Sequence, residues 1–203
     1  SQVRLASASV VPMDEWAFNT NQEYTVDGLR YYIDTEHGIA QFNGIYGTWN
    51  DSEFELPSVI TVNGEAYTVV SMENRYRYGQ DSITSVVLPQ SLRRIGQYAF
   101  RYFSSLTSLD VPANVEVFGS QVFYGCDNEN INISIKMNPI TPPALEGDLG
   151  GYSKKKIIVP DGTLHAYRLA NDWSNCVLVS ENPVTVTVDV ADPGELGRLV
   201  LDE

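Results

Sequence analysis

Residues 83–103 read ITSVVLPQSLRRIGQYAFRYF, and residues 106–126 read LTSLDVPANVEVFGSQVFYGC. Aligned at an offset of 23 residues, the two segments share their apolar positions, a proline and a glycine. The matched pairs are Ile83 with Leu106, Val86 with Leu109, Leu88 with Val111, Pro89 with Pro112, Leu92 with Val115, Ile95 with Phe118, Gly96 with Gly119, Phe100 with Phe123 and Phe103 with Cys126. The clearest repeats are thus 83–105 and 106–128, and such a period predicts a stack of similar coils.

Each position in this repeat has a physical role. Ile83, Val86 and Leu88, spaced as LxxLxL, place apolar side chains on the inner face of a short strand. A proline then ends the strand because it cannot donate to a ladder. Gly96 marks a place that needs a positive φ or close packing, and Phe100 fills the layer below the next coil. We predict a leucine-rich-repeat solenoid, made mainly of short β-strands with turns and few short helices.

Degraded copies of the coil flank the two clear ones. The segment Phe54-Glu55-Leu56-Pro57 imitates the strand and its terminal proline, and residues 131–143 and 156–160 do so again downstream. An insertion before the clear repeats carries Asn63-Gly64 between alternating apolar residues. That pattern predicts a β-hairpin with a type I′ turn.

The ends of the repeat region are predicted to be caps. Residues 24–49 alternate between apolar and polar positions, with turn signals at Asp27-Gly28 and His37-Gly38, and predict a β-meander. At the other end Asp161 is the expected N-cap of a helix with Leu164, Tyr167 and Ala170 on one face and Trp173 as an anchor. We expect an N-terminal extension over 1–22, the capped repeat domain over 23–180, and a linker or the start of a following module over 181–203.

Composition narrows the partners. The net charge of −13 disfavours binding to nucleic acid and to anionic membrane surfaces. No stretch approaches the roughly 20 apolar residues that span a bilayer, so we expect no membrane insertion by these residues. Cys126 and Cys176 have no metal-ligand spacing. A disulfide between them stays open at this point, but free thiols are favoured because Cys126 falls in the core slot of Phe103.

The pattern IxSVxLPxSLxxIGxYAFxxFxSLTSLxVPxxVxxFGxxxFxGC in residues 83–126 resembles the BspA-like leucine-rich repeats of bacterial cell-surface proteins. Residues 24–33 and 62–72 resemble the entry to such domains, and residues 138–145 and 157–173 resemble the exit. The resemblance implies a secreted or surface-anchored protein of the bacterial outer envelope, non-enzymatic and associated with adhesion. Arg77 departs from the pattern in the slot of Phe100 and Phe123, so we expect an irregular coil at residues 73–82.

Catalytic motifs are missing from the sequence. It contains no Walker loop, GxGxxG, HExxH, GxSxG or CxxC, and no calcium loop of the DxDxDG type. Glu53 and Glu55 share one strand face at roughly 6.5–7 Å, the kind of separation that glycosidases use. The polar face of any half-buried strand has the same pattern, and we favour that interpretation. We therefore expect no enzyme activity, no cofactor and no metal site.

The most unusual local feature is basic and aromatic. Residues 75–102 concentrate arginine and tyrosine in an otherwise acidic chain, and these types are enriched in binding hot spots. The candidate ligand-binding residues are Arg75, Tyr76, Arg77, Tyr78, Arg93, Arg94, Tyr98, Arg101 and Tyr102. The alternative is that rings and guanidinium stems only cover the edge of the stack.

Three functions remain open from the sequence. The first is a binding or adhesion module for a host extracellular protein, another cell or a glycan. The second is a structural spacer or accessory domain of a larger surface protein. The third is a carbohydrate-active enzyme, which depends on Glu53 and Glu55 alone.

Overall fold

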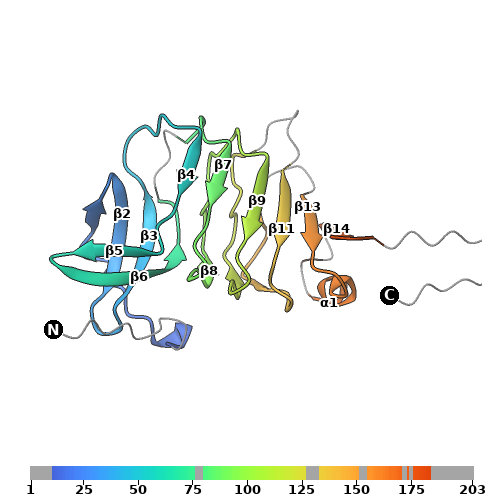
Figure 1. The fold of residues 1–203 in the computed structure, drawn as a ribbon, viewed down its shortest axis with the longest axis horizontal. Coiled ribbons are helices and arrows are strands. Elements are labelled where there is room, and N and C mark those ends of the chain that lie inside the picture. Colours follow the sequence, from blue (N-terminus) through green and yellow to red (C-terminus); the bar gives the residue numbers. More distant parts are fainter. Residues whose placement is uncertain are drawn as a thin grey trace, which may run out of the picture.

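Two parallel ladders of short strands define the solenoid (Figure 1). The computed structural model describes residues 11–75, 80–126, 133–150, 155–170, 173 and 176–183. The first ladder contains β4 (Glu53–Glu55), β7 (Ser85–Val87), β9 (Ser108–Val111), β11 (Ser134–Met137), β13 (Lys156–Val159) and β14 (Val177–Ser180). The second contains β3 (Ile39–Ile45), β6 (Glu65–Met72), β8 (Arg94–Ile95), β10 (Val117–Phe118) and β12 (Ala144–Leu145). The predicted leucine-rich-repeat solenoid is confirmed.

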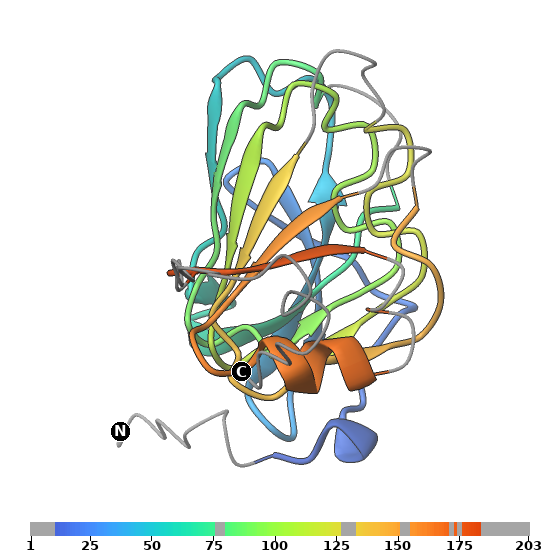
Figure 2. The same ribbon diagram turned by 90° about the vertical axis from the view of Figure 1, so that its right-hand side faces the viewer.

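The offset of 23 residues is visible in the strand register. Val117 lies beside Arg94, and Phe118 lies beside Ile95, in the parallel pair of β8 and β10. The degraded copies form coils as predicted, because β4 pairs with β7, and β11 and β13 pair with each other. Viewed along the stack, the coils overlie one another, with β14 and the C-terminal helix nearest the reader (Figure 2).

The inward side chains form columns that run through the coils. Phe100 and Phe123, both fully buried, stack with ring centroids 5.5 Å apart and planes 13° apart. Phe103 and Cys126 share one slot, as predicted, and the Cys126 thiol donates to the Phe100 carbonyl at 2.8 Å. Cys126 and Cys176 are both free thiols. Burial of each apolar edge by the next coil supplies the main stabilising term of the stack.

Gly96 and Gly119 are needed for close packing, which resolves the choice left open by the sequence. A Cβ built on Gly119 would lie 2.5 Å from the Gln97 nitrogen and 2.6 Å from the Gly96 carbonyl carbon. A Cβ on Gly96 would lie 2.6 Å from Cγ of Glu73. The backbones of successive coils therefore touch along this column, and backbone atoms leave no room for a side chain at Gly119.

Gly119→Ala is expected to lower the free energy of unfolding by about 1–3 kcal/mol, because the added methyl group must push two coils apart. Urea unfolding followed by circular dichroism measures the effect. Ser108→Ala, on the exposed face of β9, is the control and should change stability by less than about 0.5 kcal/mol. An unchanged midpoint for Gly119→Ala would contradict the close-packing account.

The N-terminal cap is the predicted meander. β1 (Tyr24–Val26), β2 (Leu29–Asp34) and β3 are antiparallel, and β3 then joins the second ladder beside β6. The hairpin of β5 (Val59–Val62) and β6 turns at Asn63 and Gly64, whose φ angles are 53° and 85°. Two positive φ angles are what a type I′ turn requires, so this prediction is confirmed as well.

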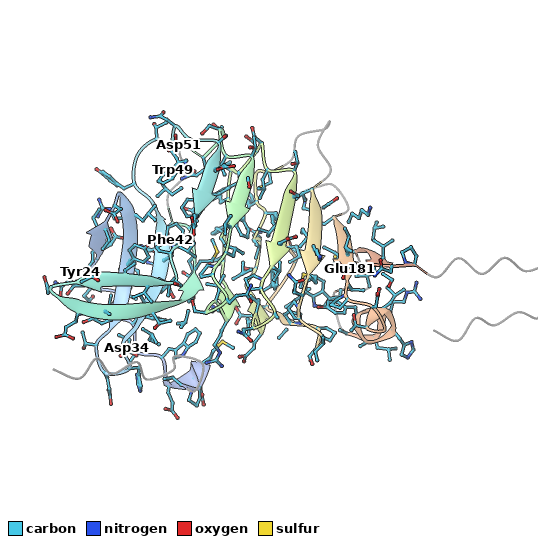
Figure 3. The ribbon with its side chains drawn as sticks, in the orientation of Figure 1. Tyr24, Asp34, Phe42, Trp49, Asp51 and Glu181 are labelled. Atoms are coloured by element: carbon cyan, nitrogen blue, oxygen red, sulfur yellow. The ribbon has the colours of Figure 1, made fainter. Side chains whose placement is uncertain are left out.

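Residues 11–18 lie across the outside of the cap. They include the 3-10 turn η1 (Met13–Glu15), and Trp16 and Phe18 cover buried Ile39 and Val70. Asp34 anchors this segment by accepting from the Ala17 amide at 2.9 Å, and Figure 3 shows it at that edge of the cap. The same carboxylate lies 2.8 Å from Nδ1 of His37.

The Asp34–His37 contact predicts a pH dependence. Burial raises the pKa of Asp34, but hydrogen bonds from Ala17 and His37 outweigh it and hold that pKa below its usual value. The hydrogen bond to Asp34 raises the pKa of His37. The Asp34 contribution is therefore present above about pH 4 and lost as pH falls through the folded pKa, whereas the His37 contribution is complete below about pH 6.5 and lost as pH rises through its raised value.

We expect Asp34→Asn to destabilise the protein most at about pH 5, with a smaller loss toward about pH 3 and about pH 9. Urea midpoints of wild type and variant at the three pH values give the comparison. Asp14→Asn, at an exposed position of η1, is the matched control. An identical pH profile for Asp34→Asn and wild type would show that the pair contributes nothing.

The C-terminal cap holds the one α-helix of the described residues, α1 (Leu164–Leu169). Leu164, Tyr167 and Trp173 are buried and Ala170 packs against the core, as predicted. The predicted N-cap was wrong: Thr163 occupies that position without a side-chain cap bond.

Asp161 is used elsewhere, which explains the error. Its carboxylate accepts hydrogen bonds from the Asn182 amide at 2.8 Å, from Asn182 Nδ2 at 2.7 Å and from the Ser180 hydroxyl at 3.0 Å. The side chain therefore holds the chain that leaves β14. Residues 184–203, where a linker was predicted, lie outside the described residues.

Candidate functional site

The nine predicted site residues do not form one patch. Tyr76, Arg77 and Tyr78 lie outside the described residues. The other six divide into a group held in contacts within the fold, Arg75, Arg93 and Arg94, and a group that shares one turn, Tyr98, Arg101 and Tyr102.

Arg93 and Arg94 are both paired with carboxylates. Nε of Arg93 lies 2.7 Å from Glu116, and its guanidinium also lies 5.4 Å from the Trp16 ring centroid. Arg94 binds Glu146 through two parallel bonds of 2.7 and 2.6 Å. The hydrogen bond from Arg94 lowers the pKa of Glu146, so the pair stays ionised. These two charges are compensated within the fold and offer little to a ligand.

Arg75 is also occupied, though loosely. Its side chain is 55% exposed, its Nε lies 4.0 Å from Glu73, and its guanidinium lies 5.5 Å from the Tyr32 ring centroid. The pKa of Glu73 is raised by burial, against the opposing effect of Arg75 and Arg94. The position is accessible but far less organised than the turn that follows β8.

That turn carries what we call the arginine–tyrosine cluster: Tyr98, Arg101, Tyr102 and Tyr124. Cζ of Arg101 lies 4.6 Å from the ring centroid of Tyr98, 5.0 Å from that of Tyr102 and 5.1 Å from that of Tyr124. Tyr124 also meets Tyr98 and Tyr102 edge to face, at 5.8 and 5.9 Å. All three distances for Arg101 are within the range of a cation–π contact.

The backbone beneath the cluster is rigid. Coil-to-coil hydrogen bonds run from Tyr98 to Ser120 at 3.3 Å, from Phe100 to Val122 at 2.9 Å and from Tyr102 to Tyr124 at 3.0 Å. They tie the two turns together on alternate residues. The cluster is therefore formed before any ligand arrives.

Two tyrosines of the cluster have an unfavourable backbone conformation. Tyr98 and Tyr102 have φ angles of 58° and 60°, and the residues one repeat later, Gln121 and Gly125, have 53° and 72°. The left-handed conformation costs a residue with a side chain roughly 1–2 kcal/mol. Such strain is concentrated at functional sites. Gly125 leaves open the space that the Tyr102 ring occupies.

Tyr124 was not among the predicted site residues. The signal that identifies it is the repeat itself, because Tyr124 follows Arg101 by 23 residues and must lie over it in the stack. Its side chain is 41% exposed, the most accessible ring of the cluster.

Arg101 has no carboxylate partner within the described residues. Of the arginines described there, Arg30, Arg75, Arg93 and Arg94 lie within 4.0 Å of a glutamate, and only Arg101 and Arg168 do not. The Nε atom of Arg101 is buried without a hydrogen-bond acceptor. A guanidinium so placed can accept one anionic group, with the tyrosine rings as the contact surface beside it.

Glu53 and Glu55 lie exposed on one face of β4, as predicted. Among the described residues no cluster of three or more histidine, cysteine, aspartate or glutamate side chains is arranged to hold a metal ion. Nor does any helix described there have the length and apolar character needed to cross a bilayer.

Residues 68–148 match the family described as BspA type leucine rich repeat region (6 copies). No curated protein matches the chain.

Three solved structures are similar to it. A leucine-rich repeat protein from Bacteroides ovatus is 20% identical, with 68% of this chain and 49% of that chain covered and a TM-score of 0.41. A leucine rich repeat protein from T. pallidum is 17% identical, with 79% and 84% covered and a TM-score of 0.46. A pneumococcal vaccine antigen is 15% identical, with 70% and 51% covered and a TM-score of 0.40. The chain spans about half the length of the Bacteroides and pneumococcal proteins.

Proposed function

Since residues 68–148 are a leucine-rich repeat region of the BspA type, we propose that the chain is a non-enzymatic binding module, secreted or displayed at a bacterial cell surface. Its arginine–tyrosine cluster is the contact site for an extracellular protein or glycan. The family supports the surface setting, and the geometry of the turn supports the place of contact.

The observation that carries the proposal is the uncompensated Arg101. Three of the four other arginines of the candidate set that are described have glutamate partners, and the remaining tyrosine positions surround Arg101 itself. Holding a guanidinium among three rings without a carboxylate has a desolvation cost that an anionic ligand group repays. Arginine and tyrosine also lead the residue types found at binding hot spots.

The charge of the whole chain limits the ligand. At a net charge of −13, a long polyanion is repelled before it reaches the cluster. A single acidic group, carried by a protein segment or by a sulfated or uronic sugar, meets that field only once. The cluster therefore fits a ligand with one anionic group beside an apolar or sugar face.

The test is an array of extracellular-matrix proteins and glycans probed with this chain. We expect Arg101→Gln to weaken binding to the recovered ligand by about tenfold or more, because it removes a charged hydrogen-bond donor. Tyr124→Ala should weaken it by about three- to fivefold.

Arg168→Gln is the matched control. Arg168 is exposed on α1 and, like Arg101, has no carboxylate partner within the described residues, so the two variants change the net charge equally. Equal losses for both variants would reduce the effect to overall charge. No binding across the array would favour a structural spacer instead.

A further inference from the structure

A second surface, unrelated to the arginine–tyrosine cluster, lies on the first ladder. A groove of about 510 Å³ is bordered by Trp49, Asp51, Ser52, Glu53, Phe54, Glu55 and Val87. Trp49 and Asp51 come from the loop that leads into β4, and Figure 3 shows both beside that strand. The cluster described above lies instead on the turn between β8 and β9, on another side of the coil.

The groove is a formed surface. The Trp49 indole donates to the Glu53 carbonyl at 3.0 Å and packs edge to face on Phe54 at 5.5 Å. The next coil pins the loop, because the Ser82 hydroxyl donates to the Trp49 carbonyl at 2.6 Å and the Thr84 amide donates to the Ser52 carbonyl at 2.8 Å. Val87, 55% exposed, adds an apolar floor.

The carboxylates of the groove have no countercharge. Glu23, Glu73, Glu116, Glu146 and Glu181 all have a basic partner within 4.0 Å. In contrast, Asp51, Glu53 and Glu55 form no ion pair with any described residue, although they lie along one short segment. Their arrangement does not suit a metal ion either, because the described residues contain no metal-holding group of three such side chains.

We propose that this groove binds a basic, extended segment of a partner protein. A lysine or arginine side chain of that segment lies against the Trp49 indole, and the carboxylates of Glu53 and Glu55 neutralise it. Charge complementarity selects the partner, since the groove is acidic and the net charge of −13 steers cations toward the molecule. The tryptophan face adds the attraction that an aromatic ring has for an ammonium or guanidinium group.

Other occupants fit less well. A neutral sugar would stack on Trp49 but gives the three carboxylates no role, and an acidic segment would be repelled by them. The proposal is independent of the arginine–tyrosine cluster, which selects the opposite charge.

The experiment is isothermal titration of the whole chain with blocked (Gly-Lys)4 peptide at about 50 mM salt, where surface charges are only partly screened. The variant Glu53→Gln with Glu55→Gln should weaken binding by about five- to tenfold. Trp49→Ala should weaken it by about threefold. Glu65→Gln with Asp110→Asn removes two exposed charges elsewhere and is the matched control, expected to stay within about twofold of wild type.

The competing occupants have their own titrations, with (Gly-Glu)4 and with the neutral sugar chitotetraose. We expect neither to bind at this groove. The proposal is overturned if the lysine peptide does not bind, or if the control variant loses as much affinity as the groove variant. Binding of chitotetraose that is lost in Trp49→Ala and kept in the glutamine variant would identify a glycan groove instead.

Discussion

The close approach of successive coils at Gly96 and Gly119 is the constraint on which the rest of the structure depends. With no Cβ between them, the backbones of two coils come into contact, and a side chain at Gly119 would collide with backbone atoms. Neighbouring strands in a ladder lie about 4.8 Å apart, and the glycine column allows that spacing to continue through the turn after each strand. The stacked rings of Phe100 and Phe123 and the hydrogen bonds between the two turns follow from it.

Once this spacing is set, residues 23 apart must lie over one another. The buried slots tolerate only side chains that fill the column, such as Ile95 and Phe118. The exposed slots have no such restriction. One of them holds Arg101 above Tyr124, and another holds Tyr102 where the next coil has Gly125. A tyrosine in a left-handed conformation is costly, and in this fold the cost falls at a surface position beside an unpaired guanidinium.

Much of the fold could be predicted because its signals are local or periodic. The 23-residue offset located the strands and the buried column that contains Cys126, and Asn63-Gly64 located the hairpin. The N-cap at Asp161 was wrong because the competing partners, Ser180 and Asn182, belong to a strand reached only after the helix. A short polar residue before a helix is an N-cap signal only when nothing else binds its side chain.

The candidate site was predicted less well, for a related reason. Arg94 is neutralised by Glu146, 52 residues away on a coil that departs from the repeat, so no local pattern indicates the pair. Tyr124 was within reach of the repeat register, but the search for basic residues ended before it. The groove at Trp49 required the packing of a loop onto the next coil, which sequence spacing does not show.

The central claim is that residues obeying the repeat hold the fold, whereas departures from it at residues 98–102 make the contact surface. Replacing the departures by their counterparts one repeat later tests this directly, in the variant Tyr98→Gln, Arg101→Tyr and Tyr102→Gly. The measurement is its affinity for a ligand recovered with the wild-type chain, on protein whose urea unfolding has been recorded. We predict unfolding within about 1 kcal/mol of wild type, because strain is relieved as ring contacts are lost, together with loss of binding. Retained binding, or a chain that no longer folds, would contradict the account.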